Sequence, residues 1–129
     1  MKDKKGFTLI ELLVVIAIIG VLSLMGLRLY LTQQEKAKNA IVKANAGTVQ
    51  TLIQAELADE DVTLEAAVDI ATKAGLHNPF NGVAMNLESW FPESADTPGE
   101  IQITLSAGIF SIQGYGADGL LLDILTARR

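Results

Sequence analysis

The hydrophobic positions of this chain divide it into an apolar start and a mixed remainder. From Phe7 to Leu27 nearly every side chain is apolar, and the only charged one is Glu11. About 20 apolar residues in a helix, rising ~1.5 Å each, span the ~30 Å hydrocarbon core of a bilayer. We therefore predict that residues 7–28 form a single membrane-spanning helix.

Beyond Arg28 the apolar positions recur at spacings of three and four, which is the period of an amphipathic helix. The spacing predicts one face that packs against a globular head, made of Ala37, Ile41, Ala44, Thr48, Leu52 and Ala55. The side chains between them predict a solvated face, made of Gln33, Glu35, Lys36, Lys38, Lys43 and Gln50. No helix breaker precedes Asp59, so residues 29–58 are predicted to continue the same helix.

The remainder, residues 59–129, is predicted to form the globular head. Thr63 is placed to cap a short helix over residues 64–74, because its hydroxyl can accept a hydrogen bond from the first turn. Gly75 follows as a left-handed stop signal, since glycine adopts positive φ without strain. The head is therefore expected to begin with one short helix.

Alternating apolar residues predict three strands in the last part of the chain, over residues 101–106, 109–115 and 120–126. The dipeptides Ala107-Gly108 and Asp118-Gly119 predict the turns that connect them. The predicted fold class is α+β. A long N-terminal helix packs on a small C-terminal antiparallel sheet of about three strands in meander order, with a short second helix.

Composition narrows the classes of function. The chain has 129 residues, a formal net charge of −5 and a pI of about 4.7, which argues against a nucleic-acid-binding surface. It has no cysteine, so disulfides, thiolate metal sites, thiol catalysis and lipoprotein acylation are excluded. The single histidine, His77, leaves little material for histidine-based catalysis or metal binding. We predict no catalytic, cofactor-binding or metal-binding residue.

Three features of the head have both a structural and a chemical explanation. The acidic run 59–61 fits a solvated turn or, alternatively, the ligands of a cation. His77 fits a polar position in a loop or a ligand position. Trp90 and Phe91, in a predicted loop over 87–99, fit the core of the head, or else a ligand site or an exposed surface. We predict the structural role for each.

Lysines flank the apolar run on its N-terminal side. Lys2, Lys4 and Lys5 precede it, with Asp3 as the single acid among them. Because Lys and Arg are enriched at the cytoplasmic ends of membrane helices, the N-terminus is predicted to stay in the cytoplasm and residues 29–129 to lie outside it. An ordinary secretory signal fits poorly, since it has a shorter apolar region followed by a small-residue cleavage site.

Glu11 lies near the start of the apolar run, where a carboxylate is costly and marks a functional candidate. A cut after Gly6 would create a cation in the same layer, the α-amine of Phe7, and pairing lets two charges enter an apolar bundle together. Alternatively, Glu11 snorkels to the interface or complements the helix dipole from the first turn. Charge placement alone leaves both explanations open.

The sequence KKGFTLIELLVVIAIIG, from Lys4 to Gly20, resembles the leader and first turns of type IV prepilins and their pseudopilin relatives. That family has a basic leader ending in Gly, then Phe, and a Glu five residues into the mature chain. The resemblance implies removal of residues 1–6 by a prepilin peptidase that cuts after Gly6, and N-methylation of Phe7. It also implies that Glu11 neutralises the N-terminal amine of a neighbouring subunit during assembly.

The resemblance implies a function as well. The implied function is that of a structural, major pilin-like subunit, which polymerises through its N-terminal helix into a type IV pilus filament. Membrane-bound assembly machinery is an implied partner, and no cofactor is expected. Such a subunit is a single-pass membrane protein before assembly and part of an extracellular filament at the cell surface afterwards. The alternative is a pseudopilin of a type II secretion or DNA-uptake system. A distant alternative is a signal-anchored extracytoplasmic enzyme or binding protein, although no nucleophile-elbow or metal-ligand spacing occurs.

One departure from the family concerns the flexibility of the spanning helix. Many members carry a proline in its second half, whereas no proline precedes Pro79 here. Gly20 and Gly26 each lower helix stability by ~1 kcal/mol relative to alanine and could supply similar local freedom. With Ala17 and Ser23 they also share a face on which another helix could approach closely, although ordinary membrane-helix composition explains them equally well.

Overall fold

The computed structural model describes residues 5–90, 97–119 and 122–129. The helices in this part of the chain are α1, Leu9–Asp59, α2, Leu64–Lys73, and the short 3₁₀ helix η1, Leu87–Trp90. The strands are β1, Ile101–Ser106, β2, Ile109–Gly114, and β3, Leu125–Arg128. The predicted α+β class is therefore confirmed.

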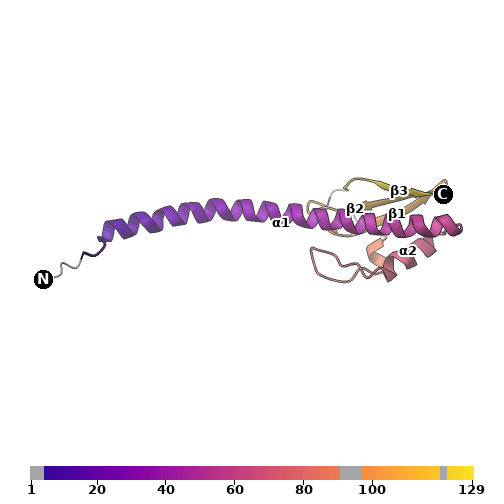
Figure 1. Ribbon diagram of the computed structural model, residues 1–129, viewed down its shortest axis with the longest axis horizontal. Coiled ribbons are helices and arrows are strands. Elements are labelled where there is room, and N and C mark those ends of the chain that lie inside the picture. The colour runs from indigo at the N-terminus through magenta and orange to yellow at the C-terminus, as the bar shows by residue number, and fades with distance from the viewer. Residues whose placement is uncertain (1–4, 91–96, 120–121) are drawn as a thin grey trace. The chain divides into compact units, whose positions relative to one another are not determined.

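The chain forms two compact units, residues 1–34 and residues 35–129, and α1 contributes to both. The first unit holds the apolar half of α1 and the segment before it. In the second unit, the sheet and α2 lie against the later half of α1 (Figure 1), where one cluster of buried apolar side chains joins them.

The face of α1 that packs in this core differs from the predicted one. Its buried members are Val42, Ala46, Val49, Ile53 and Leu57. In the predicted set, Leu52 is half-buried and Ile41 is 47% exposed, and the remaining members are exposed: Ala37, Ala44, Thr48 and Ala55. Both sets repeat at threes and fours, so the helical period does not choose between them. The buried set carries the larger aliphatic side chains, whose burial removes more apolar area from water.

The sheet contributes the other side of the core. Its buried side chains are those of Ile101, Ile103, Phe110, Ile112 and Ala127. At the end of β2 the strand comes so close to α1 that a Cβ on Gly114 would collide with Cγ1 of Val42. Glycine at position 114 therefore permits the close approach of β2 to the helix.

The strands pair antiparallel in the order β1-β2-β3, which is the predicted meander. Ala107 and Gly108 form the two-residue turn between β1 and β2, with φ values of 51° and 78°. Positive φ at both positions is typical of a type I′ turn, whose twist matches that of the flanking strands. Ser106 pairs with Ile109 directly across this turn, as the sequence predicts.

The third strand begins later than the predicted range 120–126, of which residues 120 and 121 lie outside the described part. Leu122 is held as a loop residue: its N–H donates to the backbone O of Gly114 at 2.7 Å, and its own O accepts from Nε2 of Gln113 at 3.2 Å. These two bonds fix the chain across the end of β2, so regular pairing starts only at Leu125. The predicted boundary is therefore wrong, although the strand exists.

The predicted turn before this segment is present. Gly119 has a φ of 73°, and its N–H donates to the backbone O of Gly116 at 3.0 Å. Strand β2, however, ends one residue earlier than the predicted Tyr115.

Gln50 does not belong to a solvated face, as the sequence pattern had indicated. Its Nε2 donates to the backbone O of Thr126 at 2.7 Å. Gln54 bonds Arg128 twice, with Nε2 donating to its O at 2.7 Å and Oε1 accepting its N–H at 3.1 Å. The outer backbone groups of an edge strand are otherwise open to pairing with another chain. Helix α1 thus covers the outer edge of β3 with two amide side chains.

Both predicted signals for the short helix α2 are confirmed. Oγ1 of Thr63 accepts a hydrogen bond from the N–H of Ala66 at 3.2 Å, which is the expected N-cap. Gly75 follows the helix with a φ of 67°, as a left-handed stop requires. The helix itself ends at Lys73, one residue before the predicted end.

Trp90 is a core residue, as predicted, although it lies in the 3₁₀ helix η1 and not in a loop. Its side chain is fully buried, and its indole N–H donates to Oγ1 of Thr72 at 3.0 Å. Burial of a large ring with its polar atom bonded explains why an aromatic residue is tolerated here. Phe91, for which the same core position is predicted, lies outside the described residues.

His77 makes a local contact, and Asp61 of the acidic run pairs with a residue that is distant in the sequence. Nδ1 of His77 lies 3.1 Å from the backbone O of Gly75, in the exit from α2. Asp61 forms a surface ion pair with Arg129, whose guanidinium nitrogen lies 2.8 Å from the carboxylate. In the described ranges, no group of three or more His, Asp or Glu side chains is placed to hold a metal ion.

Candidate functional site

The apolar half of α1 is uncovered along its length. Its large side chains are exposed by half or more, from Leu9 at 77% to Leu31 at 51%. Among the residues that the structure describes, α1 is the one helix long and apolar enough to cross a membrane. So much contiguous apolar surface is normally covered by lipid or by other protein.

The segment before α1 is not helical, and it is exposed from Lys5 to Thr8. Phe7 is 82% exposed. At Gly6, φ lies outside the left-handed region, and no described residue beyond its two chain neighbours lies within 4 Å of the place that a Cβ would occupy. Among the described residues, neither backbone strain nor crowding therefore requires glycine at position 6.

Thr8 and Glu11 form a reciprocal cap at the start of α1. The N–H of Thr8 donates to Oε2 of Glu11 at 3.3 Å, and the N–H of Glu11 donates to Oγ1 of Thr8 at 3.3 Å. The backbone O of Thr8 accepts a helical bond from Leu12, also at 3.3 Å. This is a capping box, in which side chains satisfy N–H groups that the first turn of a helix leaves open.

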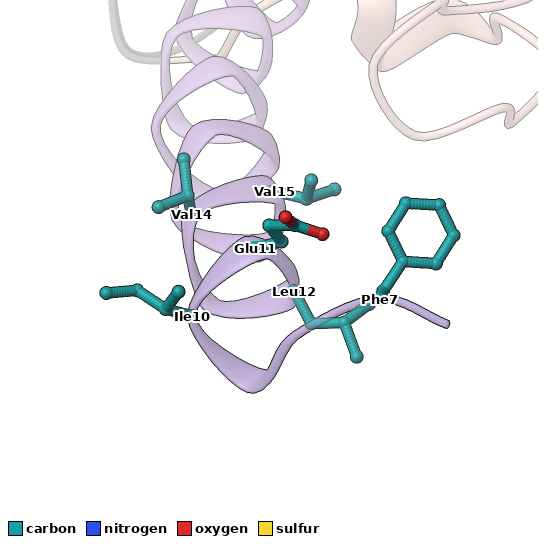
Figure 2. Close-up of a pocket in the computed structure, with 6 residues that line it drawn as sticks. All are labelled: Phe7, Ile10, Glu11, Leu12, Val14 and Val15. Carbon is teal, nitrogen blue, oxygen red and sulfur yellow. The ribbon is translucent and has the colours of Figure 1, made fainter. Parts of the chain in front are cut away.

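The Glu11 carboxylate lies in an apolar setting. Figure 2 shows it projecting from the helix on the side of Phe7 and Val15, whereas Ile10 and Val14 project from the other side. Together with Leu12 these side chains line an open hollow on the helix surface. In the described residues, the carboxylate accepts a hydrogen bond only from Thr8, through Oε2, so Oε1 can accept another donor.

The structure brings Gly6, Phe7 and Glu11 together at the start of α1. Of the two explanations for Glu11, the one that places it in the first turn of the helix has geometric support in the cap. Cleavage, methylation and pairing with an amine remain predictions. Sequence reasoning missed Thr8, although Thr-x-x-Glu before an apolar run is a readable capping signal.

Comparison with known proteins points to the same segment. Residues 1–27 match the family described as the Prokaryotic N-terminal methylation motif. The chain is also similar to the fimbrial protein EcpB of Eikenella corrodens, with 36% identity over 90 residues. Together, the leader motif and the similarity to a fimbrial protein support the type IV pilin and pseudopilin family for this chain. The alignment covers 69% of this chain and 57% of the length of EcpB, and no solved structure matches it.

Proposed function

We propose that this chain is a structural subunit that is made as a prepilin, cut between Gly6 and Phe7, and polymerised into a type IV pilus. The observation that carries the proposal is the Glu11 carboxylate. Thr8 holds it at the start of an uncovered apolar helix, about one helical turn from the bond to be cut. The similarity to a fimbrial protein supports the same role.

The surroundings of Gly6 support cleavage. A protease binds an extended and accessible segment, and the backbone from Lys5 to Thr8 is exposed and lies outside α1. The described residues make no demand for glycine at position 6, which fits a requirement set by a partner. In this proposal the partner is a prepilin peptidase whose active site leaves no room for a side chain before the scissile bond. The new N-terminus, Phe7, is the residue that we propose to be N-methylated.

Cleavage creates an α-amine at Phe7, beside the apolar half of α1. A lone ammonium or a lone carboxylate is costly in hydrocarbon, and pairing the two lowers that cost. Glu11 can keep its cap on Thr8 through Oε2 while Oε1 accepts the amine of a neighbouring subunit. In this way one carboxylate serves the helix of its own subunit and the contact with the next.

The later half of α1 also offers a face for close contact with another subunit. Between Ala44 and Ala55 the helix carries no charged residue. The hydroxyls of Thr48 and Thr51 donate to carbonyls of the same helix at 3.0 and 2.9 Å. Their hydroxyl protons therefore need no hydrogen-bond acceptor from another subunit. In the described part of the chain, nothing outside the adjoining helix backbone and the two chain neighbours comes within 4 Å of the missing Cβ of Gly47. Small residues without unsatisfied polar groups permit close approach of helices.

Location and partners follow from the same proposal. Before assembly, the subunit is a single-pass membrane protein with its lysine-rich leader in the cytoplasm and its head outside. After assembly, it is part of an extracellular filament on the cell surface. Its partners are further copies of itself, the peptidase and the assembly machinery in the membrane. The role is structural and not enzymatic.

A pseudopilin of a secretion or DNA-uptake system is the second candidate, because it would use the same leader, cap and apolar helix. The two differ in their product, since a pilin forms long surface filaments in wild-type cells and a pseudopilin does not. Electron microscopy with an antibody to this chain, on wild-type and deletion strains, separates them. Long labelled filaments in the wild type support the pilin, and their absence supports the pseudopilin.

The direct test of processing is the mass of the N-terminal peptide of the protein purified from its own cells. We expect a chain that begins at methylated Phe7. Gly6→Arg should leave the leader attached, because the side chain blocks the peptidase without disturbing the fold. Lys5→Arg is the matched control, since it keeps the leader charge and should be cut normally. Mature protein beginning at Phe7 in the Gly6→Arg strain would refute the proposed cut.

A further inference from the structure

The loop after α2 carries an Asn-Gly pair, Asn81 and Gly82, which the proposed function does not use. In the sequence, Asn81 is the only asparagine that is followed by glycine. An asparagine in this position is chemically reactive, because the backbone nitrogen of the next residue can attack the side-chain amide and glycine has no Cβ to obstruct the attack. Both residues are exposed, so water and hydroxide ions reach them.

The reaction of such a pair is a deamidation that needs no enzyme. The nitrogen of Gly82 loses its proton to a base in the solvent and forms a bond to Cγ of Asn81. The bond from Cγ to the side-chain nitrogen breaks, and ammonia leaves with a proton. Water then opens the resulting succinimide ring at either carbonyl and gives aspartate or isoaspartate. The net change is that asparagine and water become an acidic residue and ammonia.

The native turn holds the attacking nitrogen in a hydrogen bond. The N–H of Gly82 donates to the backbone O of Asn78 at 2.8 Å. Loss of this proton is the first step of the reaction, so that bond has to open first, as it does for hydrogen exchange of a protected amide. The side chain that is attacked is held as well, because Oδ1 of Asn81 accepts the N–H of Val83 at 2.9 Å.

Asn78 ties this turn to the rest of the head. Its N–H donates to the backbone O of Val83 at 2.9 Å and closes the turn from the other side. Its side chain is 4% exposed, with Nδ2 donating to the backbone O of Pro98 at 2.9 Å and Oδ1 accepting the N–H of Phe80 at 2.8 Å. Gly99 lies so close that a Cβ there would collide with this side chain. Contacts from a distant segment therefore resist opening of the turn.

We propose that Asn81 is a latent deamidation site, which the closed turn of residues 78–83 protects and which reacts when the turn opens. The change is permanent. Aspartate adds a negative charge, and isoaspartate adds a methylene group to the backbone between Asn78 and Val83, which are joined by a hydrogen bond in the native turn. The acidic residue at position 81 thus records that a head has opened. This chemistry does not depend on cleavage or assembly, so it stands apart from the proposed function.

The test compares the rates at which the native and the unfolded head lose the side-chain amide of Asn81. The full chain in phosphocholine micelles is kept in mildly alkaline buffer with guanidinium chloride, or with sodium chloride at the same concentration. Peptide mass spectrometry follows the mass gain at residue 81. We expect the native rate to be at least about tenfold lower, which corresponds to an opening free energy of about 1.4 kcal/mol or more. In the unfolded chain Asn39, which precedes Ala40, is the internal reference and should react more slowly.

Hydrogen exchange at the Gly82 amide provides a second measurement. Exchange and deamidation both begin with loss of the same proton, so one opening of the turn controls both. The factor by which the native head slows exchange of this amide, relative to the unfolded head, should therefore agree in order of magnitude with the factor for deamidation.

Two variants connect the protection to the contacts of Asn78. Gly99→Ala puts a Cβ where the Asn78 side chain lies, and Asn78→Ala removes the side-chain bonds to Pro98 and Phe80. Each should raise the native deamidation rate severalfold, toward that of the unfolded head. Gly26→Ala, the same substitution in the apolar half of α1, is the matched control and should leave the rate unchanged. The indole resonance of Trp90 reports whether each variant keeps its fold.

Three outcomes would overturn the proposal. The first is that Asn81 reacts as fast in the native head as in the unfolded one. The second is that Asn81 reacts no faster than Asn39 in the unfolded chain. The third is that the exchange of the Gly82 amide is slowed by a factor of a different order from that for deamidation, or that folded variants at positions 78 and 99 both react at the wild-type rate.

Discussion

The N–H of Thr8 donates to the carboxylate of Glu11 at 3.3 Å, and the N–H of Glu11 donates back to the hydroxyl of Thr8 at the same distance. The acid therefore has a structural role in the chain that does not depend on any neighbouring amine. Backbone N–H groups left without a partner are costly in an apolar layer, so the cap stabilises a helix that starts at Leu9. Capping and charge pairing can be separated by substitution.

Thr8→Val removes the hydroxyl of the cap and keeps the β-branched shape. Loss of an N-cap side chain costs about 1 kcal/mol of helix stability, which corresponds to roughly fivefold more frequent opening of the first turn. We expect the Glu11 amide proton to exchange faster with solvent by that factor, measured by NMR of the full chain in micelles. Thr8→Ser retains the hydroxyl and is the control. Equal exchange rates in the valine variant and the wild type would contradict the cap.

Glu11→Gln keeps the cap and removes the charge, because glutamine can also complete a capping box. We expect this variant to be cut after Gly6 and to remain in the membrane, but to yield few or no filaments. Glu11→Leu removes both functions and should in addition expose the first-turn amides to exchange. The measurements are the N-terminal mass and the amount of filament sheared from cells. Wild-type filament yield from Glu11→Gln would show that charge pairing is not needed.

Ile53 and Ile41 test which face of α1 packs in the head, because they are the same residue type on the same helix. Ile53 is fully buried, whereas Ile41 is 47% exposed. Ile53→Ala should lower the free energy of unfolding of the head by about 2–5 kcal/mol, through lost burial and the cavity left behind. Ile41→Ala should change it by less than about 0.5 kcal/mol. Urea unfolding followed by Trp90 fluorescence measures both, and a larger loss at Ile41 would restore the face that the sequence pattern first suggested.

The elements that could be predicted from the sequence depend on local chemistry. Thr63 caps α2 with its own hydroxyl, and Gly75 and Gly108 adopt positive φ at the ends of their elements. The packing face of α1 could not be predicted, because two sets of positions share the helical period. The choice depends on contacts with distant residues, such as the approach of Gly114 to Val42.

The same distinction separates the candidate site from the contacts within the head. The segment of the proposed cut can be read from the sequence because Gly6, Phe7 and Glu11 lie within a few consecutive residues. The close approach of Gly99 to the Asn78 side chain cannot, since the two residues are distant in the sequence and meet only in the folded head. The spacing of residues along the chain does not predict such a contact between distant positions.

Substitutions at Gly47 should affect the stability of the chain and the proposed assembly in different ways. No described residue beyond the adjoining helix lies within 4 Å of the missing Cβ of Gly47, so Gly47→Ala should stabilise α1 by about 1 kcal/mol. Gly47→Leu should also fold, because leucine is a good helix former and the space is open. If this face contacts a second helix closely, the leucine variant should be cut and membrane-bound but yield far less filament, with the alanine variant in between. Unfolding midpoints and sheared filament amounts measure the two effects, and wild-type filament yield from Gly47→Leu would show that this face is not part of the subunit contact.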